Sequence, residues 1–284
     1  MDIFKFKFLA PLIYFECESP PIILKENHIM IRQISQAEKK DIQETQQKLY
    51  FKSPAKYLLE CALFKKKPET APREHQTEAI DKINRIITIL RLYKEGPVGQ
   101  NLIIQPYSEE SHPAFNAVSV GYYEPRPIYN KENQLQKYKI ISGETKEFTK
   151  FYAEFDLMDF RDLDLAIEYF NKSYTEAFFP RDALINLMIS LENLYLKGES
   201  LELSYKLSMR ASFILATGPN ERKEVFDDMK KAYKYRSAIV HGERSRKISE
   251  EFFFKIREYT RQSLIFFLSN PSLRNNLDKT ILQG

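Results

Sequence analysis

The sequence is poor in glycine and cysteine. Its 284 residues include 8 glycines, which form neither a glycine-rich phosphate loop nor the strand-to-helix turn that exposes a catalytic serine. The two cysteines, Cys17 and Cys61, lie far apart, and neither stands at metal-ligand spacing from another cysteine or a histidine. A disulfide framework and a zinc site are therefore not expected, and we predict no cofactor and no metal ion.

Long apolar runs and an excess of one charge are also missing. No segment reaches the apolar length of a membrane span, and the alternation of Phe and Lys over residues 4–8 fits a strand better than a secretory signal. The formal net charge of +4 at pH 7 permits nucleic-acid binding without requiring it. The lack of a membrane span, of a secretory signal and of a disulfide framework together favours a cytoplasmic protein without a membrane partner.

Residues 1–150 have the pattern of a mixed α/β domain. Strands are expected at residues 3–8, 11–16, 28–34, 101–107 and 114–123, helices at 36–48, 73–93 and 142–155, and a polar loop at 125–137. Residues 55–64 fit either type, and the lysine run 65–67 that follows fits a solvated turn or a nucleic-acid patch. Sensing, docking and substrate positioning all stay open as roles of this domain, and with them a regulatory ligand or protein partner.

Two local features of this domain carry further predictions. Ser35 and Glu38 have the spacing of a capping box, which would start the helix at residue 36. His28, His75 and His112 are not grouped with other metal ligands. We therefore predict structural or solvent-facing positions for these histidines.

Residues 156–272 are helical in pattern throughout. Apolar stripes at helical spacing recur in successive segments, and Gly198, Gly218-Pro219 and Gly242 separate them. Short joints of this kind connect antiparallel neighbours in a bundle. The sequence thus predicts an α+β protein in which a mixed α/β domain precedes an all-α antiparallel helical bundle.

Arg236 interrupts the apolar stripe of the fourth helix in this bundle. A guanidinium that points toward a core is costly unless it meets a carboxylate, a phosphate or water. The position therefore predicts a paired or functional arginine. The stripe that contains it consists of Val225, Met229, Ala232 and Ile239.

His241 follows Arg236 by five residues. At about 100° per residue it lies about 140° further round, so one straight helix does not bring both side chains to one point. Gly242 suits the position just past a helix end, which would place His241 in the last turn. A structural arginine and a surface histidine are the alternative interpretation of this pair.

Glu192 is a second charged residue that does not fit the amphipathic pattern of its helix. On the second helix it projects about 100° away from the polar face, among apolar residues. A carboxylate there needs a partner, and Arg236 is the natural candidate. The pair would be either a buried structural bridge or an active-site acid that positions the arginine. The polar face itself is predicted to consist of Asn186, Ser190 and Asn193.

The residues around Arg236 and His241 resemble a known motif. Residues 235–242 read YRSAIVHG, which is similar to the arginine, four residues, histidine signature of HEPN domains, and most closely to its Apea-like branch. The resemblance extends over about residues 160–270, including Asn220-Glu221-Arg222, and more weakly into the N-terminal half. It implies a homodimer whose two motif copies line one cleft, which would solve the problem of convergence.

The resemblance also implies a metal-independent endoribonuclease, often a toxin or effector in prokaryotic antiviral defence. A histidine can take the 2′-hydroxyl proton of RNA, while an arginine stabilises the charge that gathers on the attacked phosphate. The RNA species is not predicted. The catalytic candidates are Arg236, His241 and Glu192, and the candidate substrate-binding residues are Ser237, Tyr235 and Lys234.

Ser237 departs from many nuclease members of the family, in which a larger polar residue such as Asn or Asp follows the arginine. Its hydroxyl can still donate to a phosphate. The departure leaves a second interpretation open, a catalytically inactive HEPN module that binds RNA, nucleotide or a partner protein through the same cleft. A third, an all-α docking domain in which the Arg and His are incidental, predicts no interaction with nucleic acid.

Overall fold

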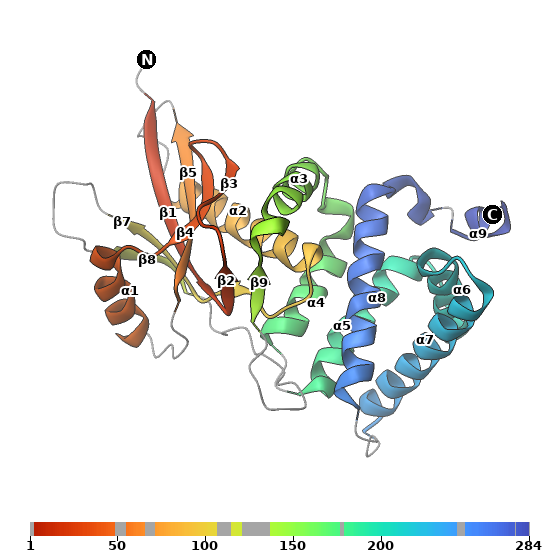
Figure 1. Cartoon of the computed structure of the whole chain (residues 1–284). Coiled ribbons are helices and arrows are strands. Elements are labelled where there is room, and N and C mark those ends of the chain that lie inside the picture. Colours follow the sequence, from red (N-terminus) through yellow and green to blue (C-terminus); the bar gives the residue numbers. More distant parts are fainter. Residues whose placement is uncertain are drawn as a thin grey trace. The chain divides into compact units, whose positions relative to one another are not determined.

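The structure is a computed structural model that describes residues 3–48, 55–65, 72–106, 115–120, 137–176, 179–242, 248–275 and 277–283. The chain divides into two compact units, Met1–Leu157 and Met158–Gly284. The first holds an antiparallel sheet with helices and the second is helical, so the predicted α+β class is confirmed (Figure 1). Within the described ranges, no helix combines the length and apolar character that crossing a membrane requires.

The first unit is built on a sheet with the strand order β3-β4-β5-β1-β7-β8, in which β6 also pairs with β1 (Figure 1). All of these pairings are antiparallel. The segment 55–64, which the sequence left ambiguous, contains most of the central strand β5. Its residues from Tyr57 to Leu63 are all buried, including Glu60, whose carboxylate meets Lys7 and Arg32. The strands of this sheet are β1 (Phe4–Ile13), β3 (Ile22–Lys25), β4 (Ile29–Gln33), β5 (Tyr57–Lys65), β6 (Gly99–Gln100), β7 (Leu102–Pro106) and β8 (Phe115–Val120).

Strand β1 corrects the prediction of separate strands at residues 3–8 and 11–16. It runs continuously through Pro11, which pairs with Leu58 of β5. On its other side β1 pairs at Leu9 with β7 and again from Leu12 with β6. Pro11 lies in the gap between these two pairings, where its missing N–H interrupts no ladder, so a proline is tolerated in a central strand.

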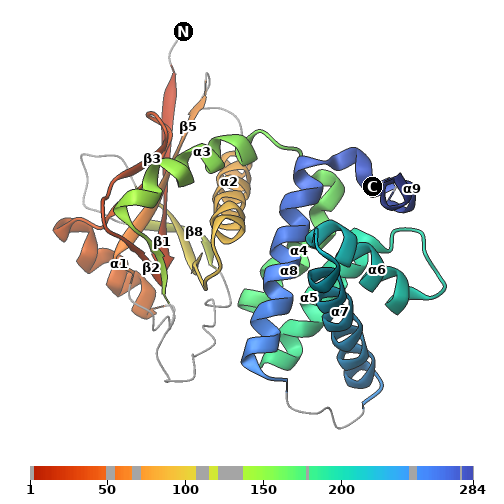
Figure 2. The same ribbon diagram turned by 45° about the vertical axis from the view of Figure 1, so that its right-hand side comes forward.

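A second, two-stranded parallel sheet joins β2 (Phe15–Cys17) to β9 (Tyr138–Ile140). Helix α2 (Pro72–Tyr93) matches the predicted helix, and α3 (Thr145–Asp156) follows a short 3-10 turn, η1 (Ser142–Glu144). The two helices pack together (Figure 2). Arg85 of α2 donates to the carbonyl oxygens of Phe155 and Asp156 at 2.9 and 3.0 Å, which satisfies acceptors at the end of α3.

Some predictions fall on residues that are not described. Residues 66–71, with Lys66 and Lys67 of the lysine run, lie outside the described ranges, as do His112 and residues 121–136, which include most of the predicted loop. His75 is buried, and its ring lies 4.8 Å from that of Phe6, between centroids, so its predicted structural position is confirmed.

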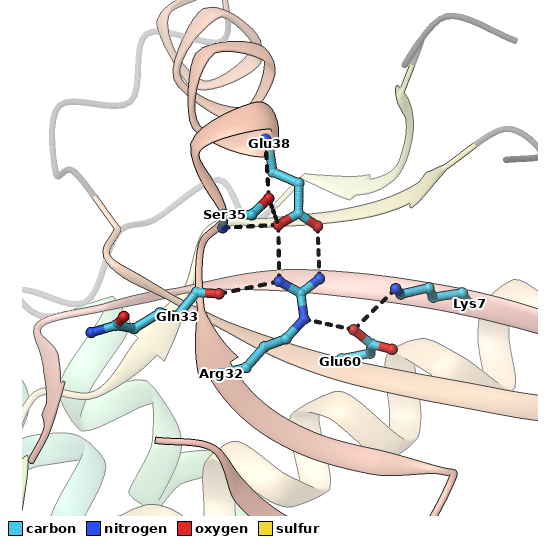
Figure 3. Close-up of polar contacts among 6 residues, drawn as sticks. All are labelled: Lys7, Arg32, Gln33, Ser35, Glu38 and Glu60. Atoms are coloured by element: carbon cyan, nitrogen blue, oxygen red, sulfur yellow. Dashed lines mark hydrogen bonds and ion pairs between the residues drawn. The ribbon is translucent and has the colours of Figure 1, made fainter. Parts of the chain in front are cut away.

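The predicted capping box starts helix α1 (Gln36–Lys48). The N–H of Glu38 donates to the Ser35 hydroxyl at 3.3 Å, and the N–H of Ser35 donates to the Glu38 carboxylate at 3.0 Å. Arg32 adds a fork to the same carboxylate at 2.7 and 2.9 Å and turns its Nε to Glu60 at 2.8 Å (Figure 3). Lys7 lies 3.1 Å from Glu60, so strands β1, β4 and β5 are tied to the start of α1.

This network predicts a pH-dependent stability. The Arg32 fork holds the pKa of Glu38 at about 2, well below its ordinary value of 4.5. A lowered folded-state pKa adds stability above the unfolded-state value, and this stability is lost as the pH falls from about 4.5 toward 2. Glu38→Gln should therefore lower the free energy of unfolding by about 2–3 kcal/mol at pH 7.

Urea unfolding at pH 7 and at pH 3 measures this difference, which should shrink at the lower pH. Glu44→Gln is the matched control on the same helix, because Glu44 faces Lys40 at 3.9 Å with half of its side chain exposed and should cost less than about 0.5 kcal/mol. An equal effect of both substitutions would contradict the assigned role of the Arg32 fork.

The second unit is a helical bundle around α5, which packs against α4, α6, α7 and α8 (Figure 1). The predicted apolar stripe of α5, Leu184, Leu187, Met188, Leu191 and Tyr195, is fully buried. The helices are α4 (Asp164–Thr175), α5 (Pro180–Tyr195), α6 (Leu203–Leu215), α7 (Pro219–Val240) and α8 (Glu250–Ser269), and they lie where the apolar periodicity predicts them.

Two elements after α8 were not predicted, a 3-10 turn η3 (Pro271–Asn275) and a short helix α9 (Leu277–Gln283). Helix α9 is tied to the bundle by Arg210 of α6, which is 5% exposed. Its guanidinium donates to both oxygens of Asp278 at 2.7 Å, to Glu199 at 2.6 Å and to the Tyr195 carbonyl at 2.6 Å. This is a buried charge whose hydrogen bonds join α5, α6 and α9.

Candidate active site

Helix α7 carries the motif at its C-terminal end. The N–H of His241 donates to the Ser237 carbonyl at 3.0 Å, and the N–H of Gly242 donates to the Ile239 carbonyl at 3.1 Å. Gly242 has a φ of +72°, a left-handed conformation that glycine adopts without side-chain strain. His241 is the residue that ends the helix, so the predicted helix end at Gly242 is confirmed.

Arg236 turns from α7 toward α5 and meets Glu192, so the predicted pairing is found. Its Nε lies 3.2 Å from Oε1 of the carboxylate, and its Nη2 donates to Oε2 at 3.4 Å. Nε and Oε1 are buried but are not aligned as a hydrogen bond, so the contact is an ion pair with one long hydrogen bond and not a tight fork. The two side chains stay 29% and 23% exposed, which places the pair at the edge of the core instead of inside it.

The electrostatics of the pair reflect this partial burial. Burial raises the pKa of Glu192, while the positive charge of Arg236 acts in the opposite direction. Tyr233 lies close enough to interact electrostatically with both charges. Its pKa is raised mainly by burial. The negative charge of Glu192 adds to this rise, and the positive charge of Arg236 opposes it. Tyr233 thus belongs to the site, although the sequence did not select it. Its spacing of three from Arg236, which puts both on one helical face, was the available signal.

His241 stands apart from this cluster. It is exposed at the end of α7, next to Val240, which is 55% exposed. Over the described ranges, its side chain makes no hydrogen bond or ion pair with Arg236 or Glu192, whose contacts are with each other. A single chain therefore brings the arginine and the carboxylate together and leaves the histidine on another side, as helical geometry requires.

The candidate substrate-binding residues differ in their access to solvent. Lys234 is exposed, and Ser237 is half-buried. The ring of Tyr235 packs edge-to-face on Phe252 of α8, with centroids 5.7 Å apart, and the Nζ of Lys231 lies 4.3 Å from the centroid of the same Phe252 ring. Lys231 and Lys234 thus offer positive charge beside the motif, while Tyr235 serves packing.

The polar face predicted for α5 is wrong. Ser190 is fully buried, and its hydroxyl donates to the Ala166 carbonyl of α4 at 2.7 Å. Asn193 accepts a hydrogen bond from Arg274 at 2.8 Å. Four helices pack against α5, so Ser190 and Asn193 are satisfied by the chain, while Asn186 and Asn193 stay partly exposed.

Comparisons with known proteins do not bear on the interpretation of this site. Neither protein-family models, nor curated proteins, nor solved structures gave a match to this chain. In the part of the chain that the structure describes, no group of three or more His, Cys, Asp and Glu side chains could hold a metal ion. The site is thus defined by Glu192, Tyr233 and Arg236, with His241 at the helix end.

Glu192→Ala tests the role of the ion pair. It should lower the free energy of unfolding by about 1–3 kcal/mol, because the buried Nε of Arg236 loses its counter-charge. Glu192→Gln keeps the shape and an acceptor, so it should cost less. Denaturant unfolding of both variants measures the difference. Wild-type stability in Glu192→Ala would show that the carboxylate does not hold Arg236.

Proposed function

We propose that this protein is a metal-independent endoribonuclease that cleaves RNA by attack of the 2′-hydroxyl on the adjacent phosphate. The observation that supports the proposal is that one helix end presents a partly exposed arginine held by a carboxylate, together with an exposed histidine, inside the motif YRSAIVHG. The setting that the resemblance favours is a toxin or effector of prokaryotic antiviral defence that acts in the cytoplasm.

The reaction needs a base, a cation and the substrate's own nucleophile. His241 takes the proton of the 2′-hydroxyl, whose oxygen forms a bond to phosphorus while the bond to the 5′-oxygen breaks. The imidazolium of His241 then gives up a proton to the leaving 5′-oxygen, directly or through water, which restores the base. The products are a 2′,3′-cyclic phosphate and a 5′-hydroxyl end. Arg236 stabilises the negative charge on the phosphate oxygens in the transition state.

The geometry of Arg236 leaves donors for this task. A guanidinium carries five N–H donors, and Glu192 takes one long hydrogen bond from Nη2 and an unaligned contact from Nε. The carboxylate therefore orients the fork without saturating it. Lys234 and Lys231 add positive charge that would hold the RNA backbone.

A second copy of the chain would bring an arginine and a histidine together. We propose a homodimer in which two α7 ends face each other, with the exposed Val240 and His241 near the contact. Light scattering measures the mass in solution. A monomer at micromolar concentration, both with and without RNA, would rule out a site composed of two chains.

The experiment that tests the proposal uses an end-labelled RNA in EDTA. Cleavage should persist, leave 2′,3′-cyclic phosphate ends and be absent on DNA, because DNA lacks the nucleophile. A single 2′-deoxy substitution at the mapped cut should abolish cleavage at that bond. If that bond is still cut, or if cleavage requires Mg²⁺, the mechanism assigned to Arg236 and His241 is wrong.

One observation favours a second candidate function. Arg236 is already paired with Glu192, and the small Ser237 follows it, so the cleft could hold a phosphate without cleaving the chain. A catalytically inactive module that binds RNA, nucleotide or a partner protein would then give RNA binding with no cyclic phosphate. The same end-labelled RNA distinguishes the two functions, since binding without cut ends assigns the chain to the second.

A further inference from the structure

The first unit contains a small pocket that the proposed ribonuclease function does not use. It has a volume of about 40 Å³ and lies between the β3–β4 hairpin, β5, α2 and α3. Its walls combine a few apolar side chains with polar groups that come from distant parts of the sequence. The polar groups are Lys25 and His28 of the hairpin, Lys82 of α2, and Tyr152 and Asp156 of α3.

Tyr152 is the unusual member of the pocket. It is 2% exposed, and its buried hydroxyl has no well-aligned hydrogen bond within the described ranges, although the Asp156 carboxylate lies close enough to interact with it. A buried polar group without a well-aligned hydrogen bond destabilises the fold, and a ligand that accepts from it would remove that cost. Burial, and to a smaller extent the charge of Asp156, raises the pKa of the phenol, so the hydroxyl keeps its proton and can donate it to a ligand.

His28 also lines the pocket, and its ring is fixed by local contacts. Its Nδ1 lies 2.7 Å from the Glu26 carbonyl, which accepts a hydrogen bond and so fixes Nδ1 as the donor. The ring packs on Phe64, with centroids 4.6 Å apart. Nε2, the nitrogen at the other edge of the ring, has no hydrogen bond within the described ranges. These contacts agree with the predicted structural or solvent-facing position of His28.

The charges around the pocket favour an anion. Lys25 has no ion pair among the described residues, and Lys82 faces the partly exposed Glu78 at 3.2 Å. Asp156 is the one carboxylate in the wall, and Arg85 opposes it, with Nε 3.6 Å from the carboxylate. Arg85 offsets the charge of Asp156, and Glu78 is shared between Lys82 and Lys65. The lysines therefore leave an excess of positive charge around the pocket.

The size of the pocket limits what it can hold. One water needs about 10–15 Å³ by this measure, so a volume of about 40 Å³ has room for about three atoms of that size. We propose that this pocket binds a small oxyanion group, either a whole carboxylate or the phosphorus and two oxygens of a phosphate that projects out of the pocket, with Tyr152, Lys82 and Lys25 as donors. The site belongs to the first unit, and its test does not depend on ribonuclease activity.

Titration of the full chain with sodium phosphate and, separately, with sodium acetate tests the proposal. At constant ionic strength, calorimetry and thermal unfolding should show saturable binding of one of the two, which also identifies the preferred oxyanion. Tyr152→Phe removes only the hydroxyl. It should leave the ligand-free stability unchanged or higher, and it should weaken anion binding by about 10-fold or more.

Two lysine variants complete the test. Lys82→Gln should weaken binding by about 10-fold or more. Lys40→Gln makes the same change of charge on α1 and should leave binding unchanged, because Lys40 faces Glu44 and is not part of the pocket wall. The proposal is overturned if neither anion binds saturably. It is also overturned if Lys82→Gln and Lys40→Gln have the same effect, since binding would then follow net charge alone.

Discussion

Replacing His241 with alanine should slow RNA cleavage by about 10²- to 10⁴-fold, the range that positioned proton transfer contributes. The side chain is exposed at the helix end, and the hydrogen bond that helps to end α7 comes from its backbone N–H. The fold should therefore survive the substitution, and the loss should appear in the cleavage step. Single-turnover cleavage of an end-labelled RNA, together with the thermal unfolding of the variant, separates the two effects.

Arg236→Lys is a second test of the mechanism, because it retains the positive charge and removes the planar guanidinium. An ammonium group can still pair with Glu192, but it cannot offer a planar fork to phosphate oxygens. Cleavage should fall by about 10²- to 10³-fold, as for the loss of a donor to the transition state. Lys223→Ala is the control on the same helix, since Lys223 pairs with Asp227 on the exposed surface. For the first variant, full activity in His241→Ala would contradict the assignment of His241 as the general base.

Arg210→Ala should destabilise the second unit by about 3 kcal/mol or more, the largest stability change that we expect in this protein. The substitution removes four hydrogen bonds, two to Asp278 and one each to Glu199 and the buried Tyr195 carbonyl. Glu199 and Asp278 can turn to water, because they are 22% and 57% exposed. The main cost is therefore the unsatisfied carbonyl and the release of α9 from α6.

Arg161→Ala provides the matched control. Arg161 also forks onto a carboxylate, that of Asp159, at 2.5 to 3.0 Å, but the two side chains are 86% and 57% exposed. Solvent screens an exposed pair of this kind, so Arg161→Ala should have far less effect on stability than Arg210→Ala. Denaturant unfolding of both variants compares the stability lost with a buried and with an exposed arginine–carboxylate pair. Equal losses would show that the burial of Arg210 is not what makes its contacts stabilising.

Local order could be predicted because it depends on short-range spacing. Apolar residues three and four apart place the helices from α4 to α8, and the pattern of Ser35 and Glu38 places the start of α1. The end of α7 follows from Gly242 alone, since a left-handed residue stops a helix. Alternation did not reveal that β1 runs through Pro11, because that depends on where its neighbours pair.

The pairing of Glu192 with Arg236 was determined partly by the sequence and partly by the tertiary structure. Each residue breaks the apolar face of its own helix, so the sequence by itself determined that both charges needed a partner. Only the tertiary structure decided how deeply they are buried and that their hydrogen bond is long. It also decided the burial of Ser190, the fork of Arg210 on α9 and the pocket beside Tyr152. Those features depend on contacts between segments far apart in sequence, which helix and strand periodicity does not encode.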